Sequence, residues 1–169
     1  MDSNFGDKAM FIILTGVAGA GKTTIGKLLA GELGWQFHEG DDFHPLENIE
    51  KMRRGEALSD RDRAPWLDRL HALIEQALER QENGILACSA LKRSYRTRLR
   101  VDDRVVFVHL AVSRALTERR LKERKNHFMN PALVKSQFDT LEPPQTALTL
   151  DASLPPAVLV EQVRKALGI

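Results

Sequence analysis

The segment 16–23 constrains the fold of this chain more than any other part of its sequence. Its residues, GVAGAGKT, match the pattern GxxxxGK[ST], and they lie between the apolar run 10–15 and a stretch with helical periodicity. In that context the glycines let backbone N–H groups turn inward around phosphate oxygens at the positive end of the following helix. We therefore predict a phosphate-binding loop between a strand and a helix, with an incidental glycine turn as the alternative interpretation.

Two side chains of this loop predict how a nucleotide is held. Lys22 is placed to span the β and γ phosphates of ATP, and the hydroxyl of Thr23 is placed to hold Mg²⁺. ATP and Mg²⁺ are therefore the expected cofactors, with Thr23 as the metal-binding residue. The loop residues expected to contact the nucleotide are Gly16, Gly19, Ala20, Gly21, Lys22, Thr23 and Thr24.

Length and composition indicate one globular domain over residues 1–169. The chain is 43% hydrophobic and 28% charged, without a repeat or a linker, so we expect a single hydrophobic core. Its net charge of +2 comes from interleaved acids and bases, which does not point to nucleic-acid binding. The polar N-terminus and the short apolar run 9–14 argue against a signal peptide and a membrane span. A single cysteine, Cys88, favours a reducing compartment such as the cytoplasm.

Short apolar runs alternate with longer helical patterns along the chain. The runs expected to form strands are 10–15, 35–38, 84–88, 105–111 and 147–150. The apolar stripes expected on helices are Ile25, Leu28, Leu29 and Leu33, then Leu67, Leu70, Ile74 and Leu78, and finally Leu159, Val163 and Leu167. This alternation predicts an α/β fold, a five-stranded, mostly parallel sheet flanked by helices, with ligands at the carboxyl ends of the strands.

The phosphate loop alone does not decide the reaction, because switches, motors and kinases share it. The chain lacks the NKxD and DxxG signatures, which counts against a GTPase, and the predicted strand 84–88 ends without a magnesium-binding Asp. The acidic turn EGDD at 39–42 follows the second predicted strand. Asp41 of this turn is expected to orient an acceptor hydroxyl or accept its proton, with a solvated acidic turn as the alternative.

Longer segments of the chain resemble one protein family. The segments are, in order, GVAGAGKTT, EGDDFHPLENIEKMRRGEALSDRDRAPWL, CSALKRSYRTRLR, RLKERKNHFM and SQFDTLEPP. Together they resemble the small P-loop gluconokinases, which are similar in layout to shikimate and adenylate kinases. The resemblance implies a P-loop kinase fold with a small lid at about residues 120–135, and ATP-dependent phosphorylation of D-gluconate to 6-phospho-D-gluconate.

The resemblance also implies which residues act. The expected catalytic residues are Lys22, Asp41 and Arg124. The expected substrate-binding residues are Asp41, His44, Arg63, Ser89, Lys92, Arg93 and His127. A planar guanidinium such as that of Arg63 suits the carboxylate of a sugar acid, because it can donate two parallel hydrogen bonds. Whether Asp41 or Asp42 carries the acceptor role stays open on the sequence.

Two arginines are expected to belong to the lid. Arg120 and Arg124 are one helical turn apart, so both can face the same side of a helix. One guanidinium can stack on adenine while the other meets the transferring phosphoryl group and helps to exclude water. Arg120 therefore joins the expected nucleotide-binding residues, and a solvated surface helix is the alternative interpretation.

Two other functions stay open on the sequence. A kinase for shikimate or a nucleotide would differ in its acceptor alone, whereas a nucleotide-binding regulatory module would bind ATP without forming a product. The expected partners are small molecules, gluconate and ATP, and neither a nucleic acid nor a membrane. A homodimer is compatible with the family pattern.

Overall fold

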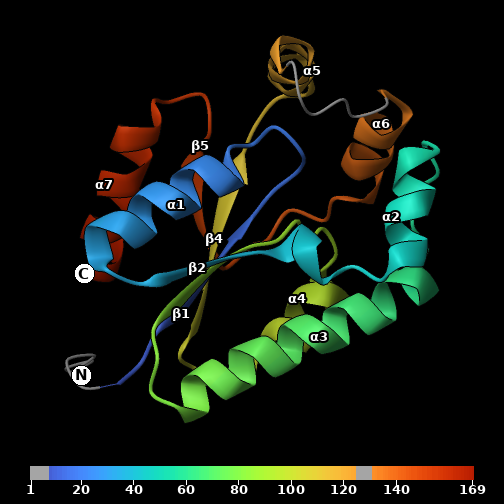
Figure 1. The fold of residues 1–169 in the computed structure, drawn as a ribbon. Helices are drawn as coiled ribbons and strands as arrows, with labels where there is room; N and C mark the ends of the chain where they lie inside the picture. Colours follow the sequence, from blue (N-terminus) through green and yellow to red (C-terminus); the bar gives the residue numbers. More distant parts are fainter. Residues whose placement is uncertain (1–7, 125–130) are drawn as a thin grey trace.

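The chain folds into a β-sheet that lies between two layers of helices (Figure 1). The computed structural model describes residues 8–124 and 131–169. The strands are β1 (Phe11–Thr15), β2 (Gln36–Glu39), β3 (Gly84–Ala87), β4 (Val105–Ala111) and β5 (Leu148–Asp151). The helices are α1 (Lys22–Leu33), the short 3-10 helix η1 (Gly40–Phe43), α2 (Leu46–Arg53), α3 (Asp60–Glu79), α4 (Arg93–Leu99), α5 (Arg114–Glu123), α6 (Pro131–Thr140) and α7 (Pro156–Leu167).

The strands pair in the order β2-β3-β1-β4-β5, and every pair is parallel. The predicted fold class is therefore confirmed, and each expected strand lies within one residue of its predicted bounds. Phe11 of β1 is aligned with Gly84 of β3 on one side and with Val105 of β4 on the other. β1 is buried along its whole length, which agrees with its uninterrupted apolar sequence.

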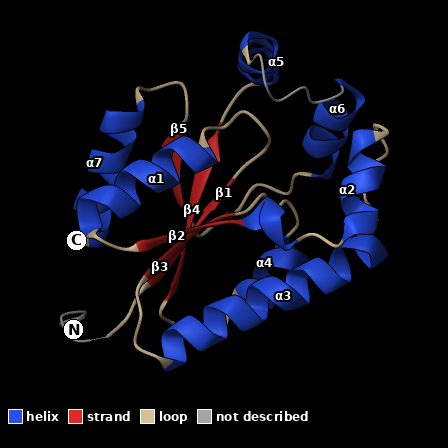
Figure 2. Ribbon diagram, in the orientation of Figure 1, coloured by secondary structure: helices blue, strands red, loops and turns tan. Residues whose placement is uncertain are grey.

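The central strand β1 has helices on both faces of the sheet (Figure 2), and its alternate side chains enter two separate cores. Phe11 and Ile13 pack with the side chains of α3 and α4, whereas Ile12 and Leu14 pack with those of α1 and α7. The expected single core is therefore wrong, because the sheet separates the buried side chains into one core on each face. The stripe predicted on α3 is buried as expected, at Leu67, Leu70, Ile74 and Leu78. Within the described part of the chain, no helix is both long and apolar enough to cross a membrane.

The stripe predicted on α1 is confirmed only in part. Ile25 and Leu29 are buried, whereas Leu28 is 45% exposed. Ile25, Leu29 and Leu33 are spaced by four residues and follow the line along which the helix packs onto the sheet. Leu28 lies beside this line and therefore faces solvent.

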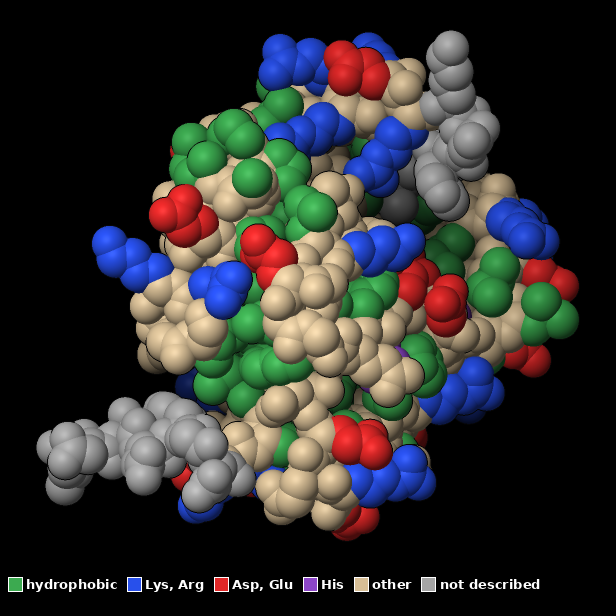
Figure 3. Space-filling view, turned by 60° about the vertical axis from the view of Figure 1, so that its left-hand side comes forward, with side chains coloured by type: hydrophobic (Ala, Val, Ile, Leu, Met, Phe, Trp, Pro, Cys, Tyr) green, Lys and Arg blue, Asp and Glu red, His purple; other side chains and the backbone are tan. Residues whose placement is uncertain are grey.

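The carboxyl ends of the strands meet at one edge of the sheet, and the predicted site segments begin there. The phosphate loop follows β1, η1 follows β2, the segment 88–92 follows β3 and α5 follows β4. Figure 3 shows Lys and Arg side chains above and below a hollow beneath α5, with Asp and Glu side chains next to the lower ones. The parallel topology thus gathers segments that are far apart in the sequence.

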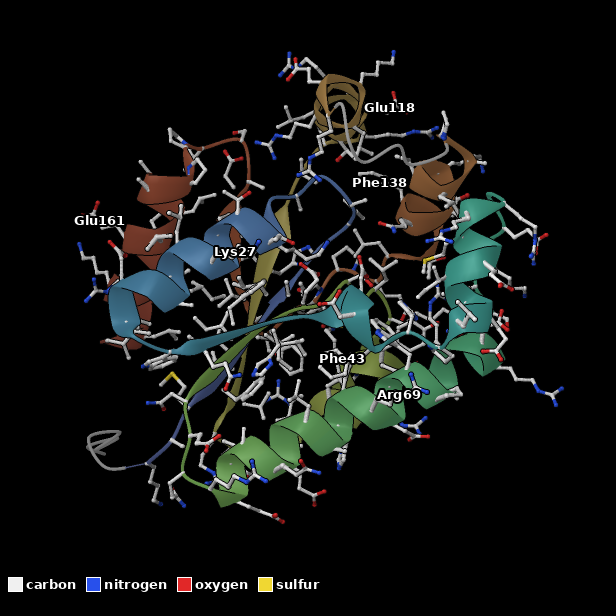
Figure 4. The ribbon with its side chains drawn as sticks, in the orientation of Figure 1. Lys27, Phe43, Arg69, Glu118, Phe138 and Glu161 are labelled. Atoms are coloured by element: carbon white, nitrogen blue, oxygen red, sulfur yellow. The ribbon has the colours of Figure 1, made fainter. Side chains whose placement is uncertain are left out.

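Several contacts fix η1 at this edge. The indole Nε1 of Trp66 on α3 donates to the carbonyl oxygen of Gly40 at 2.8 Å. Arg69 lies next to Phe43 (Figure 4), and its Nη1 donates to the Phe43 carbonyl oxygen at 3.1 Å. A Cβ atom on Gly40 would lie 2.5 Å from the carbonyl oxygen of Ala87, so η1 packs directly on the end of β3. The turn that carries Asp41 is therefore held by both α3 and β3.

The substitution Gly40→Ala tests this packing. The added methyl group has to push η1 away from β3, so we expect the free energy of unfolding to fall by about 1–3 kcal/mol in a urea titration. Gly31→Ala is the matched control, because a Cβ atom there meets no neighbour within 4 Å. Since Gly31 lies in α1, its replacement is expected to raise the free energy of unfolding by about 0.5–1 kcal/mol. Equal stability of Gly40→Ala and the wild type would contradict the close packing.

Candidate active site

The phosphate loop has the strand–loop–helix context that the sequence predicts. Gly21 directly precedes α1 and has a φ of 98°, a left-handed conformation that favours glycine. The Nζ of Lys22 donates to the carbonyl oxygens of Gly16 at 2.8 Å and Val17 at 2.9 Å, so its ammonium group lies over the loop. Burial lowers the pKa of Lys22, and the negative charge of Asp41 opposes this shift.

A carboxylate that the sequence did not single out lies beside the loop. The hydroxyl of Thr23 donates to Oε2 of Glu39, the last residue of β2, at 2.5 Å. Burial raises the pKa of Glu39, whereas the hydrogen bond from Thr23 lowers it. The two side chains form an oxygen-rich pair at the start of α1.

The acidic turn presents Asp41 to the phosphate loop. Asp41 lies on η1 and is exposed. Its charge influences the pKa values of Lys22, Glu39 and His44, although burial is the larger cause of the shift in each of them. Asp41 is among the causes of all three pKa shifts, whereas Asp42, the other carboxylate of η1, is among the causes of none. Of the two η1 carboxylates, Asp41 is therefore the one whose charge acts on Lys22.

His44 follows η1 and is almost fully enclosed. It is 7% exposed, and its ring stacks on Trp66 with 4.4 Å between ring centroids and 12° between the ring planes. Its Nδ1 lies 3.2 Å from Nδ2 of Asn48. Burial lowers the pKa of His44 to about 4, the charge of Asp41 opposes this shift and the charge of Arg63 adds to it. His44 is therefore neutral at physiological pH.

Arg63 and Lys92 meet in a cluster around Tyr95. Nη1 of Arg63 donates to the Tyr95 hydroxyl at 3.0 Å, and the guanidinium lies 5.4 Å from the centre of the Tyr95 ring. The Tyr95 hydroxyl donates to Asp60, which also accepts from Nζ of Lys92 at 2.9 Å. The cations predicted on α3 and after β3 are thus side by side, held by two residues that sequence reasoning did not select.

The segment after β3 is held by a buried arginine. Arg96 is 8% exposed, and its Nη1 donates to the carbonyl oxygens of Ala90 at 2.8 Å and Leu91 at 3.1 Å. Its Nη2 donates to the carbonyl oxygen of Glu142 at 2.7 Å. Ala90 has a φ of 41°, a left-handed conformation that is strained for a residue with a Cβ atom. Arg96 therefore stabilises an unusual backbone path at the predicted acceptor site.

Glu142, two residues after α6, also holds the segment of the predicted substrate residues. Its backbone N–H donates to the carbonyl oxygen of Leu91, and its Oε1 accepts from the backbone N–H of Arg93, both at 2.8 Å. The side chain of Arg93 is exposed, and Ser89 is half-buried. The structure therefore brings the backbone of the 89–93 segment to the site, while the Arg93 side chain faces solvent.

The helices of the predicted lid contact the phosphate loop. Arg120 on α5 donates to the carbonyl oxygens of Gly19 at 2.9 Å and Ala152 at 2.6 Å, so it bridges the loop and the segment after β5. Arg124 follows α5, and its charge adds to the lowering of the Lys22 pKa that burial causes. His127 lies outside the described residues.

Gln137 on α6 holds the phosphate loop from the other side. Its Oε1 accepts a hydrogen bond from the backbone N–H of Ala18 at 2.6 Å. This side chain belongs to a segment that the family resemblance includes, but no local pattern in the sequence assigns it a role. Only the tertiary contact reveals that α6 helps to shape the loop.

Sequence reasoning missed several residues of the candidate site, and only some of them are marked by a pattern in the sequence. Glu39 ends a predicted strand at the carboxyl edge, so strand position alone could have indicated it. Asn48 lies on α2 only four residues after His44, so the two are close in the sequence. Arg96 and Gln137 act on backbone atoms distant in sequence, and no local pattern marks them.

Comparisons with known proteins agree with this geometry. The shikimate kinase family model matches residues 18–146. A gluconokinase of Gluconobacter oxydans is 42% identical over 166 residues, which cover 96% of this chain and 93% of that protein. A solved sugar kinase from a Janibacter species has a TM-score of 0.90 and 39% identity, covering 95% of each chain. A solved gluconokinase from Sinorhizobium meliloti has a TM-score of 0.83 and 38% identity, covering 96% of this chain and 92% of that one.

The raised pKa of Glu39 predicts how its replacement changes stability. Because the folded-state pKa lies above the unfolded one, the neutral form is favoured on folding, and that stability is lost as the pH rises through the folded pKa. A glutamine amide at this position stays neutral and keeps an oxygen for the Thr23 hydroxyl. We therefore expect Glu39→Gln to raise the free energy of unfolding at pH 7 but not at pH 4, measured by urea titration at both values.

Glu161→Gln is the control for this measurement. Glu161 is an exposed residue of α7, so its replacement should change the free energy of unfolding by less than about 0.5 kcal/mol at either pH. A loss of stability in Glu39→Gln at pH 7 would show that the ionised carboxylate is favoured in the folded state, contrary to its environment.

Proposed function

The chain belongs to the gluconokinases within the shikimate kinase family, and on this premise we propose that it transfers the γ-phosphoryl group of ATP to a hydroxyl of D-gluconate. The products are ADP and 6-phospho-D-gluconate. The observation that carries the proposal is that the phosphate loop with Lys22 follows β1 and the turn η1 with Asp41 follows β2, at the same carboxyl edge of one parallel sheet. A phosphate-binding lysine beside a carboxylate that can receive a hydroxyl proton suits phosphoryl transfer to an alcohol.

The reaction needs little covalent chemistry from the protein. The acceptor oxygen forms a bond to the γ phosphorus, the bond between that phosphorus and the β–γ bridging oxygen breaks, and ADP leaves. The hydroxyl proton passes to Asp41, which is exposed and therefore accessible to a substrate. Lys22 offsets the negative charge on the transferring group, and Arg124 adds a second positive charge near it. Catalysis then rests on positioning and on charge stabilisation.

The acceptor site is proposed to lie between η1, the Tyr95 cluster and the segment after β3. Arg63 and Lys92 would bind the carboxylate of gluconate, for which a guanidinium is well shaped. Ser89 and the backbone of Arg93 would contact the sugar acid at the carboxyl end of β3. Their present partners, Tyr95 and Asp60, keep the two cations oriented toward each other.

Magnesium fits the oxygen donors at the start of α1. Mg²⁺ prefers oxygen ligands and usually keeps several waters, binding through one or two protein groups and the substrate phosphates. Thr23 and Glu39 supply such a pair, 2.5 Å apart. Among the described residues there is no cluster of three His, Cys, Asp or Glu side chains suited to a metal. The ion would offset phosphate charge, and Glu39 would hold it directly or through water.

The lid is proposed to comprise about residues 120–135 within a single domain of residues 1–169. Arg120 would contact the nucleotide base, since it already joins the phosphate loop to the segment after β5. Arg124 would meet the transferring phosphoryl group, and His127 the sugar acid. Closure of these residues over both substrates would exclude water and suppress ATP hydrolysis. We further propose that the enzyme acts in the cytoplasm, where its buried Cys88 stays reduced.

An acceptor panel tests the proposed function. ADP release is measured with Mg²⁺ and ATP in the presence of gluconate, shikimate or a nucleoside monophosphate, each against a blank without acceptor. We expect gluconate to stimulate release most strongly. Stimulation by shikimate or a nucleotide instead would reassign the acceptor, and ATP binding without stimulation by any acceptor would indicate a regulatory module.

The substitution Asp41→Asn tests the proposed proton acceptor. The amide keeps the shape of the side chain but cannot accept the hydroxyl proton, so kcat with gluconate should fall roughly 100- to 10,000-fold. ATP binding, followed by calorimetry, should stay close to that of the wild type. Asp42→Asn is the matched control on the same turn and should retain most of the activity. Loss of activity in Asp42→Asn with a near-normal Asp41→Asn would transfer the role to Asp42.

A further inference from the structure

Asn48 makes two hydrogen-bond contacts, one with the backbone of α3 and one with the ring of His44. It lies on α2, is 3% exposed and follows His44 by four residues. Its Nδ2 donates to the backbone carbonyl oxygen of Asp62 at 2.8 Å and lies 3.2 Å from Nδ1 of His44. One amide nitrogen thus faces both the start of α3 and the imidazole ring.

The contact with Asp62 fixes the orientation of the Asn48 amide. A backbone carbonyl oxygen can only accept a hydrogen bond, so the atom that faces it has to be the NH₂ nitrogen and not the amide oxygen. The second hydrogen of this NH₂ group is then available to His44. Nδ1 of His44 has to accept it, and the proton of the neutral ring consequently lies on Nε2.

The surroundings of His44 disfavour the doubly protonated ring. An imidazolium would direct an N–H at Nδ1 against the N–H of Asn48. Burial lowers the pKa of His44 to about 4. The negative charge of Asp41 on η1 opposes this shift, and the positive charge of Arg63 on α3 adds to it. A neutral ring also leaves the Asp41 carboxylate without a histidine cation beside it.

The second ring nitrogen of His44, Nε2, has no hydrogen bond to any described residue and is not among the enclosed polar atoms that lack a partner. Trp66 stacks against the ring and also donates to Gly40, so the plane of the imidazole is fixed relative to the turn that carries Asp41. Trp66 thereby sets the plane of the ring, and Asn48 sets the position of its proton.

We propose that Asn48 is a positioning residue that holds His44 as the Nε2–H tautomer, so that His44 presents a neutral hydrogen-bond donor to an oxygen of the sugar acid near Asp41 and Arg63. This inference rests on the proposed gluconate kinase function. A neutral donor binds a substrate oxygen without forming an ion pair with Asp41, which stays available for the proton of the reacting hydroxyl. Asn48 acts through His44 and does not itself contact the substrate.

The tautomer is tested first on the wild-type enzyme. Long-range ¹H–¹⁵N spectra of the ¹⁵N-labelled protein at pH 7 distinguish the two neutral tautomers from the imidazolium, and the His44→Gln variant assigns the signals. We expect a protonated Nε2 and an unprotonated Nδ1 for His44. A protonated Nδ1 at pH 7, in either the neutral or the charged ring, overturns the proposal without reference to any activity.

Steady-state kinetics then test the consequence for the substrate. Asn48→Ala frees the ring to take either tautomer, so we expect the KM for gluconate to rise roughly 3- to 10-fold, the effect of one weakened hydrogen bond, while the KM for ATP stays unchanged. Among His44 variants, His44→Gln should bind gluconate better than His44→Asn, because only the glutamine amide reaches the position of Nε2.

Asn83→Ala is the matched control for the loss of an asparagine amide. Oδ1 of Asn83 accepts from the backbone N–H of Met10 at 2.7 Å, at the amino end of the sheet and away from the site. This variant should lose thermal stability but keep the wild-type KM for gluconate. An unchanged KM in Asn48→Ala, with a stability loss like that of Asn83→Ala, overturns the proposal, because it shows a structural role alone. Absence of gluconate phosphorylation by the wild type would instead refute the proposed function, whatever the tautomer.

Discussion

The parallel pairing of β1 with both β3 and β4 is the constraint on which the rest of the structure depends. It aligns Leu14 with Ala87 on one side and with Val108 on the other, so the three strands reach the carboxyl edge of the sheet together. The phosphate loop, the segment 88–92 and α5 therefore begin beside one another, although they are distant in sequence. Because helices cover both faces of the sheet, this edge is the place where loops from several strands can surround a ligand.

Side chains from distant elements then fix the loops at this edge by bonding to their backbones. Gln137 accepts from the phosphate loop, Arg120 donates to it, Trp66 donates to η1 and Arg96 donates to the segment after β3. Backbone groups that are bound in this way lose freedom before any substrate arrives, which lowers the entropy cost of ordering the site. The strained φ of Ala90 persists because the hydrogen bonds of Arg96 and Glu142 hold the flanking residues.

The sequence predicted the parts of the molecule that local patterns encode. The five strands and the phosphate loop follow from apolar runs and glycine spacing, and both agree with the structure. Leu28 was misplaced because periodicity shows which residues share a side of a helix, but not how wide the packed stripe is. The bonds of Thr23 to Glu39 and of Ala18 to Gln137 join residues 16 and 119 positions apart, so only the folded chain reveals them. The roles of Asp41, Arg63 and Arg124 stay predictions that the geometry supports and activity measurements will decide.

The electrostatics of the site indicate what it is built to receive. Burial lowers the pKa of Lys22 and raises that of Glu39, so both ionised groups are less stable in the fold than in water. A ligand that carries phosphate charge and a divalent cation offers each of them a partner of opposite sign, and binding then recovers part of that electrostatic cost. His44 differs, because Asn48 and its buried position keep it neutral among charged neighbours. Under the proposed function, the ionised groups would serve the phosphoryl group and the metal, and the neutral imidazole would donate to a sugar oxygen. This division would keep the acceptor hydroxyl and Asp41 free to react with each other.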